Sequence, residues 1–182
     1  SGGVWGASGS HFVDALRYFV GEIEAVQALL HTFITERPSE DGRKAVTSDD
    51  FAAVHLRLEK ETLADMSFSV VAALDEKTTL TFHGEEGAMR LVGQDLFMAK
   101  AGGEWRKELQ GEELNVPGNT AGGPFGSGTV YLARALKAAL DSGNRDALLP
   151  AATFRDGLAQ QRVLDAARRS HANGGRWEKV GR

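Results

Sequence analysis

Strict alternation of apolar and polar residues in two neighbouring segments most constrains how this chain can fold. In Phe51–Glu59 the apolar positions Ala52, Val54, Leu56 and Leu58 alternate with a second set that includes a histidine, an arginine and a glutamate. Leu63–Val71 repeats this period of two after a short link, with Ala64, Met66, Phe68 and Val70 on its apolar face. Because successive side chains of a strand point to opposite faces, the two segments are predicted to be strands that pair as an antiparallel hairpin.

Further strands are expected on both sides of this hairpin. Glu24–Thr35 is rich in apolar and β-branched residues and is predicted to be a long strand, followed by a polar loop over Pro38–Ser48. The remaining predicted strands are Lys77–Phe82, Ala88–Val92, Asp95–Lys100, Glu104–Leu109 and an edge strand within Trp177–Val180. About seven strands joined mostly by short turns predict a largely antiparallel sheet.

Helical spacing of apolar residues occurs in three segments. The first predicted helix has Ser8 or Ser10 as its N-cap and ends near Val20. The other two are Thr129–Leu140 and Thr153–Asn173, and Gln110–Ser127 is predicted to be a long loop. Helices before and after a run of strands predict an α+β fold, with an open, predominantly antiparallel sheet that carries helices on one face. We expect residues 1–182 to form a single domain.

Composition excludes several classes of function. The net charge is −4 and there is no cysteine, so we expect no nucleic-acid partner, no disulfide, no thiolate chemistry and no cysteine-ligated metal site. We expect no other metal site either, because the histidines within or next to strands are interpreted as outward-facing or core-edge residues. No apolar run approaches the roughly 20 residues of a membrane helix, and no signal peptide opens the chain. We therefore expect a cytoplasmic protein without a membrane partner. The densest basic cluster, which we interpret as a solvated helix face, is Arg162, Arg168, Arg169 and Arg176.

The glycine-rich N-terminal segment, SGGVWGASGSHFVDALRYFVG, carries the best candidates for chemistry. Its glycines lack the spacing of a dinucleotide-binding loop. His11 is a candidate for proton transfer because imidazole titrates near neutral pH, although a histidine at a helix start can also satisfy local backbone groups. Asp14, one turn later, either orients His11 or pairs with Arg17. Trp5 either stacks on a sugar ring or anchors packing.

Both ends of the sequence resemble a known family. The segment GASGSHFVDALRYFVGEIEAV resembles the helix and first strand of the C-terminal domain in the glucose–fructose oxidoreductase / inositol dehydrogenase / MocA family. The segment AATFRDGLAQQRVLDAARRS resembles the family's closing helix, with matching residues at Phe154, Asp156, Gly157, Leu158 and Ser170. The strand-rich middle agrees in its order of elements.

This resemblance implies the C-terminal domain of a two-domain NAD(P)-dependent oxidoreductase that acts on a sugar, a polyol or a related hydroxy or keto compound. It implies a fold like the C-terminal domain of glyceraldehyde-3-phosphate dehydrogenase, with an open sheet face that binds another copy in a homo-oligomer. NAD or NADP would bind a separate Rossmann domain, so we expect no cofactor-binding residue and no bound cofactor in this chain. His11 would transfer a proton with support from Asp14, and the substrate would contact Trp5, Gly6 and Ser10.

One departure from the family pattern leaves a second hypothesis open. The family's aspartate four residues before the histidine corresponds to Ala7, whose side chain cannot orient a histidine by charge. Under the second hypothesis the chain is a non-catalytic dimerisation module, with a mixed sheet face suited to a wet interface. Under the first hypothesis we expect an excised domain that is inactive without its cofactor-binding half.

Overall fold

The computed structural model describes residues 2–74, 76–110, 114 and 124–181. They form two compact units, one of Ser1–Ala73 with Ala152–Arg182 and one of Leu74–Ala151. We describe each unit by itself. The expected single domain over 1–182 stays a prediction, because compact units need not be separate domains.

The first unit is built on a four-stranded antiparallel sheet. Its strand order is β10 (Glu178–Lys179), β1 (Ile23–His31), β4 (Phe51–Leu58) and β5 (Leu63–Ser69). The predicted hairpin of the two alternating segments is confirmed, since β4 pairs with β5 from Phe51 opposite Ser69 to Arg57 opposite Leu63. A short 3-10 turn over Glu59–Glu61 joins them.

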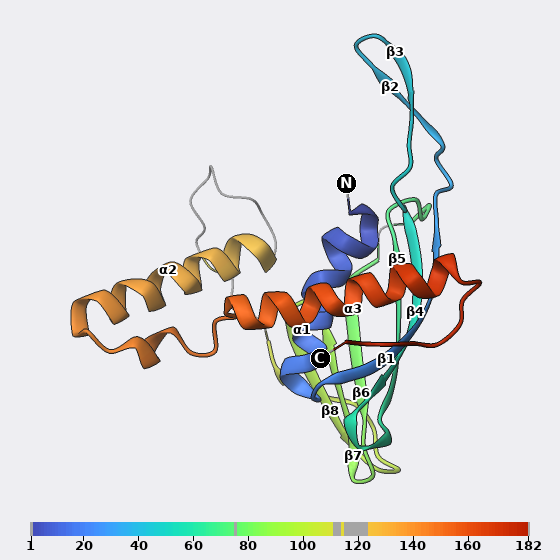
Figure 1. Cartoon of the computed structure of the whole chain (residues 1–182). Helices are drawn as coiled ribbons and strands as arrows, with labels where there is room; N and C mark the ends of the chain where they lie inside the picture. The colour runs from blue at the N-terminus through green and yellow to red at the C-terminus, as the bar shows by residue number, and fades with distance from the viewer. Residues whose placement is uncertain (1, 75, 111–113, 115–123, 182) are drawn as a thin grey trace. The chain divides into compact units, whose positions relative to one another are not determined.

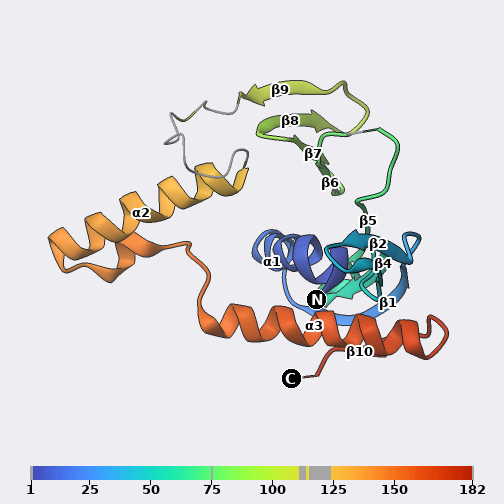
Figure 2. The ribbon, with the colours of Figure 1, turned by 90° about the horizontal axis from the view of Figure 1, so that it is seen from above.

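Two helices cover one face of this sheet and form the core with it. They are α1 (Ser10–Phe19) and α3 (Phe154–Ala172), which lie side by side in Figures 1 and 2. Side chains from the covered face and from both helices are almost completely buried; they include Val26, Ala28, Val54, Leu56, Val13, Val163 and Leu164. The predicted α+β fold, with helices on one face of antiparallel strands, is therefore confirmed.

Helix α3 is fastened to β1 by polar contacts as well as by apolar packing. Thr153 caps its first turn in a capping box with Asp156. Ser170 is fully buried, but its hydroxyl accepts from the Ala28 backbone N–H at 2.9 Å and donates to the Arg176 carbonyl at 2.6 Å. The cost of burying this hydroxyl is thus offset by two hydrogen bonds.

The other face of the sheet, which we call the open face, carries side chains that are exposed or half-buried. They alternate with the buried ones and comprise Gln27, Leu29, His31, Phe51, Ala53, His55, Arg57, Leu63, Asp65, Ser67 and Ser69. The prediction that Val70 points inward was wrong, because β5 ends at Ser69 and Val70 is 63% exposed.

The expected polar loop between β1 and β4 contains a hairpin instead. Strands β2 (Glu36–Ser39) and β3 (Gly42–Ala45) pair antiparallel with each other and extend beyond the ends of β1 and β4 (Figure 1). The turn residues are Glu40 and Asp41, between the paired Ser39 and Gly42, and Gly42 follows them with a positive φ of 110°, which a glycine adopts without strain. The turn chemistry therefore prevails over the absence of apolar alternation.

The first helix also begins earlier than expected. A π-helical turn, η1 (Trp5–Gly9), runs directly into α1, so neither Ser8 nor Ser10 is an N-cap. The first N–H groups of the helical segment have a distant partner, because Asp49 accepts from Val4 through its carbonyl and from Trp5 through its carboxylate. A tertiary contact replaces the local cap here.

The second unit contains a separate four-stranded antiparallel sheet. Its order is β6 (Thr79–His83), β7 (Gly87–Val92), β8 (Asp95–Lys100) and β9 (Arg106–Leu109). The four strands were predicted, but in one sheet with those of the first unit, because turn signals do not tell which strands share a sheet. It also holds α2 (Pro124–Ser142) and a short helix η3 (Arg145–Leu148). The predicted Gln110–Ser127 loop lies mostly outside the described residues, and its last four residues are helical.

Candidate functional site

The N-terminal helical segment displays the predicted proton-transfer residue. His11 lies in the first turn of α1 and is exposed, and Asp14 lies one turn later and is half-buried. Ala7, the position of the missing family aspartate, is exposed in the turn before His11. These three positions therefore lie along one side of a continuous helical segment, as the sequence spacing predicts.

A nearly buried arginine anchors this helix. The Arg17 side chain is 9% exposed and its Nη1 lies 3.9 Å from the Asp14 carboxylate. It also donates two hydrogen bonds to Glu22, at 2.6 and 2.9 Å, and lies 3.8 Å from the carboxylate of Asp156 at the start of α3. Of the two roles considered for Asp14, the structure shows the ion pair with Arg17.

The charges around Arg17 stabilise one another. The hydrogen bond from Arg17 lowers the pKa of Glu22, although partial burial of Glu22 acts in the opposite direction. In turn the hydrogen bond to Glu22 raises the pKa of Arg17. The carboxylates of Glu22, Asp14 and Asp156 therefore surround a permanent cation that joins α1 to the start of β1 and to α3.

Trp5 is a packing anchor in this structure. Its side chain is fully buried, its indole N–H donates to the Leu164 carbonyl at 3.4 Å, and its ring lies 6.0 Å from that of Phe68. No ring surface remains for stacking on a sugar, so the structure favours the packing role over the substrate contact expected for Trp5.

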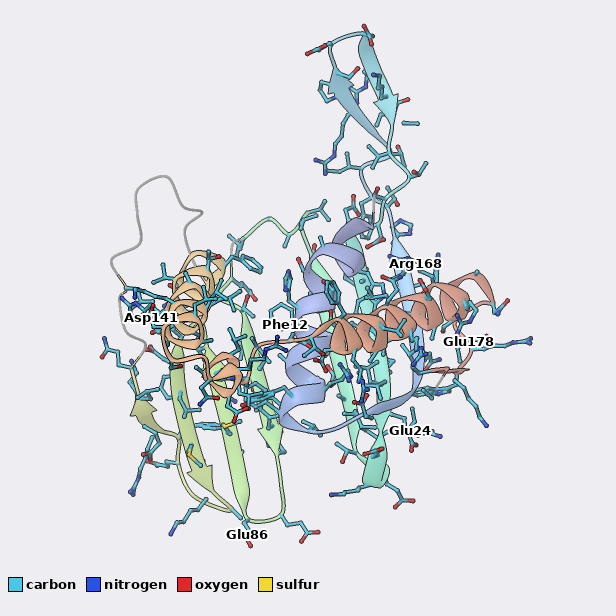
Figure 3. All side chains as sticks on the ribbon, turned by 60° about the vertical axis from the view of Figure 1, so that its left-hand side comes forward. Phe12, Glu24, Glu86, Asp141, Arg168 and Glu178 are labelled. Atoms are coloured by element: carbon cyan, nitrogen blue, oxygen red, sulfur yellow. The ribbon has the colours of Figure 1, made fainter. Side chains whose placement is uncertain are left out.

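Gly6 and Ser10 lie in the turns next to His11. The Gly6 N–H donates to the Gly2 carbonyl, and a Cβ at Gly6 would lie 3.2 Å from the Arg168 guanidinium. The Ser10 hydroxyl donates to the Ala7 carbonyl at 3.2 Å. Figure 3 labels Arg168 on α3 and Phe12 on α1. Sequence reasoning assigned Arg168 to a solvated face and missed its approach to Gly6, because nothing local links residues so far apart.

The glycines near His11 are not arranged like those of a dinucleotide-binding loop. In a Rossmann fingerprint the glycines form a loop between a strand and a helix, where the backbone approaches a pyrophosphate. Here Gly6 and Gly9 belong to a helical turn, and Gly9 packs directly against the Trp5 ring. Among the described residues there is also no group of three metal-ligating side chains and no helix long and apolar enough to cross a membrane.

The fold agrees with the class of protein that the sequence resembles. Antiparallel strands with helices on one face form the fold expected of a C-terminal domain of that family. The chain belongs to the GFO/IDH/MocA family, and its residues 1–90 match the family's model of the GFO/IDH/MocA C-terminal domain.

Curated relatives extend well beyond the length of this chain. Glucose-fructose oxidoreductase domain-containing protein 2 is 29% identical over 195 residues in both mouse and human, covering 98% of this chain and 50% of the relative. An uncharacterized oxidoreductase of Synechocystis is 32% identical over 98 residues, covering 52% of this chain and 26% of that protein. The chain thus spans about half the length of glucose-fructose oxidoreductase domain-containing protein 2, and its match covers 26% of the Synechocystis protein.

Solved structures share the fold. An oxidoreductase domain protein from Kribbella flavida has a TM-score of 0.80 at 23% identity, covering 99% of this chain and 52% of that one. Levoglucosan dehydrogenase in complex with NADH and levoglucosan has a TM-score of 0.76 at 24% identity, covering 95% of this chain and 49% of that one. At this identity the likeness shows the fold alone.

Proposed function

We propose that this chain is the substrate-binding and oligomerisation domain of an NAD(P)-dependent oxidoreductase that acts on a sugar, a polyol or a related hydroxy or keto compound. The observation that carries the proposal is the exposed His11 on helix α1. The next turn of this helix is held in place by the ion pairs of Arg17 with Asp14 and Glu22. Support comes from the family membership and from levoglucosan dehydrogenase, whose structure contains NADH and levoglucosan.

In this proposal His11 transfers a proton at the alcohol or ketone carbon of the substrate. An imidazole suits this role because it can act as a general acid or a general base, and His11 is exposed where a substrate can reach it. Asp14 has an indirect part, since its carboxylate pairs with Arg17 and ties the turn after His11 to α3. Gly6 and Ser10 lie in the preceding turns, where a substrate that reaches His11 would contact them. The nicotinamide cofactor would bind to a part of the protein outside this chain.

The decisive experiment measures polyol oxidation by the full-length protein that contains this chain. His11→Ala is expected to lower kcat/KM by about 100-fold or more, the usual contribution of a general acid–base residue. The matched control is His83→Ala, which removes an exposed histidine in β6 and is expected to leave kcat/KM unchanged. Full activity of the His11→Ala variant would overturn the assignment.

Ala7→Asp tests the departure from the family pattern in the same assay. Ala7 is exposed in the turn before His11, so an aspartate fits there without displacing core residues. We expect this variant to turn over a polyol faster than the unmodified protein, because a carboxylate then faces the imidazole. An unchanged or lower rate would show that this position does not limit the activity.

The open face supports a second candidate, a non-catalytic dimerisation module. On that face His55 lies opposite Asp65 on one side and Gln27 on the other, and exposed Leu29 and Leu63 lie among polar neighbours. Such a mixture suits a wet interface between copies. A stable dimer, together with a full-length protein that stays inactive even with Ala7→Asp, would favour this candidate.

A further inference from the structure

The β2–β3 hairpin is an exposed arm with little support of its own. Its four ladder pairs join only β2 to β3, and seven of its eight strand residues are exposed. Its ion pairs, Arg43 with Glu36 and Lys44 with Asp41, lie between exposed side chains and add little stability. A lone two-stranded hairpin is at best marginally stable in water. A surface that covers the arm would therefore stabilise it.

The base of this arm, in contrast, is held firmly. The buried carboxylate of Asp50 accepts from the backbone N–H groups of Phe33 and Ile34, both at 2.8 Å. Next to the arm, the Val46 N–H donates to the Thr35 carbonyl at 2.8 Å. The direction in which the arm leaves the sheet is therefore set by the buried carboxylate and by this backbone hydrogen bond.

Apolar and aromatic side chains surround the base and continue onto the open face. The Phe33 ring lies 4.4 Å from that of His31 and 6.0 Å from that of Phe51, both of which belong to the open face. Phe33 is 61% exposed and Leu29, on the same face, is 57% exposed. An apolar centre bordered by a charged arm resembles the core and rim of a protein interface.

We propose that the β2–β3 arm docks on a second copy of this chain and there extends the contact made by the open face. This inference rests on the sheet-mediated assembly of the proposed function. Residues 36–45 contain three acidic and three basic side chains, so the arm is electrically balanced and can complement its own copy across a two-fold axis. Nucleic acid would require an excess of positive charge, and a membrane would require an apolar tip.

The arm can be removed without disturbing its base. Residues 36–45 are replaced by Asn-Gly, so that Thr35 and Val46, already joined by a backbone hydrogen bond, flank a two-residue turn. The molar mass of the 182-residue chain and of this variant is measured by light scattering over a range of concentrations. We expect a dimer of the unmodified chain whose dissociation constant rises at least tenfold when the arm is shortened.

A charge variant tests the arm without changing its length. Arg43→Glu reverses one charge of an exposed ion pair in the arm and is expected to weaken the dimer. The matched control, Lys107→Glu, reverses one charge of the Lys107–Asp95 pair on the second sheet and is expected to leave the mass unchanged. Amide exchange in residues 36–45 should also slow as the protein concentration rises.

The outcomes separate the arm from the assembly on which it depends. If the dimer is unchanged both by the shortened arm and by Arg43→Glu, the proposed docking of the arm is overturned and sheet-mediated assembly is not. A monomer of the unmodified chain at all concentrations overturns both. Neither outcome touches the role of His11, which the activity of the full-length protein decides. If the shortened variant fails to fold, Arg43→Glu and the amide exchange still decide the question.

Discussion

Gly9 shows how one residue without a side chain shapes the start of this protein. It lies in the last position of the π-helical turn, and a Cβ placed there would lie 2.3 Å from the Trp5 ring. Both residues are buried. The helix that displays His11 can pack on the indole only because position 9 has no Cβ.

At this position we predict a clear loss of stability. Gly9→Ala forces the buried indole or the helix to move and is expected to lower the free energy of unfolding by about 1–3 kcal/mol. Gly157→Ala is the matched control, since a Cβ there, within α3, meets nothing within 4 Å, and it should raise stability by up to about 1 kcal/mol. Urea unfolding followed by Trp fluorescence measures both. Equal stability of the two variants would show that the indole shifts without cost.

The residues of the candidate site were predicted unevenly. Helical spacing alone was enough to relate His11 to Asp14, since residues three apart on a helix are neighbours. It was not enough to choose between packing and stacking for Trp5, because burial depends on what covers the ring. Nor could it place Arg168 beside Gly6, because that approach requires α3 to lie across the first helix.

At the scale of elements, Arg17 links α1 to Glu22, just before β1, and to Asp156 in α3. Arg17→Met is expected to lower the free energy of unfolding by about 1–2 kcal/mol, above the usual value for exposed pairs but reduced because Glu22 is partly in solvent. Lys137→Met is the control, since it removes an exposed pair with Asp141 on α2 and should change stability by less than about 0.5 kcal/mol. Thermal unfolding compares the two. A negligible effect of Arg17→Met would show that apolar packing alone holds α1.

Elements were predicted well where their signals are local. The alternation in β4 and β5 and the apolar spacing in α3 need only neighbouring residues, and these three elements lie close to the expected places. The β2–β3 hairpin was missed because its polar residues carry no alternation. The start of the first helix was misplaced because its cap, Asp49, is 44 positions away.

At the scale of the whole molecule, three carboxylates couple folding to pH. Burial raises the pKa of Asp50, but the backbone N–H groups of Ile34 and Phe33 more than offset this and leave it below its ordinary value. The hydroxyl and N–H of Thr153 lower the pKa of Asp156, and Arg17 lowers that of Glu22. In the unfolded chain all three carboxylates have their ordinary pKa values, which are about 4 for Asp and Glu.

We therefore predict that acid destabilises the protein. Below about pH 4 the unfolded chain binds more protons than the folded one, so stability that is fully present above the unfolded pKa is lost as pH falls through the lower folded pKa values. Urea midpoints at pH 7, 5 and 3 should be similar at the first two values and lower at the third. Asp156→Asn should reduce this dependence. A midpoint that does not change between pH 5 and pH 3 would contradict the prediction.

The sequence by itself determined most of the strands, the closing helix, the class of fold and the family, because periodicity and turn residues act over a few positions along the chain. Tertiary structure alone decided which residues support the candidate site. The Asp49 cap of the first helix joins positions 44 apart, and the contact of Arg17 with Asp156 joins positions 139 apart. Such contacts follow from how α1, α3 and the sheet pack together, and packing depends on the shapes of whole faces rather than on local pattern.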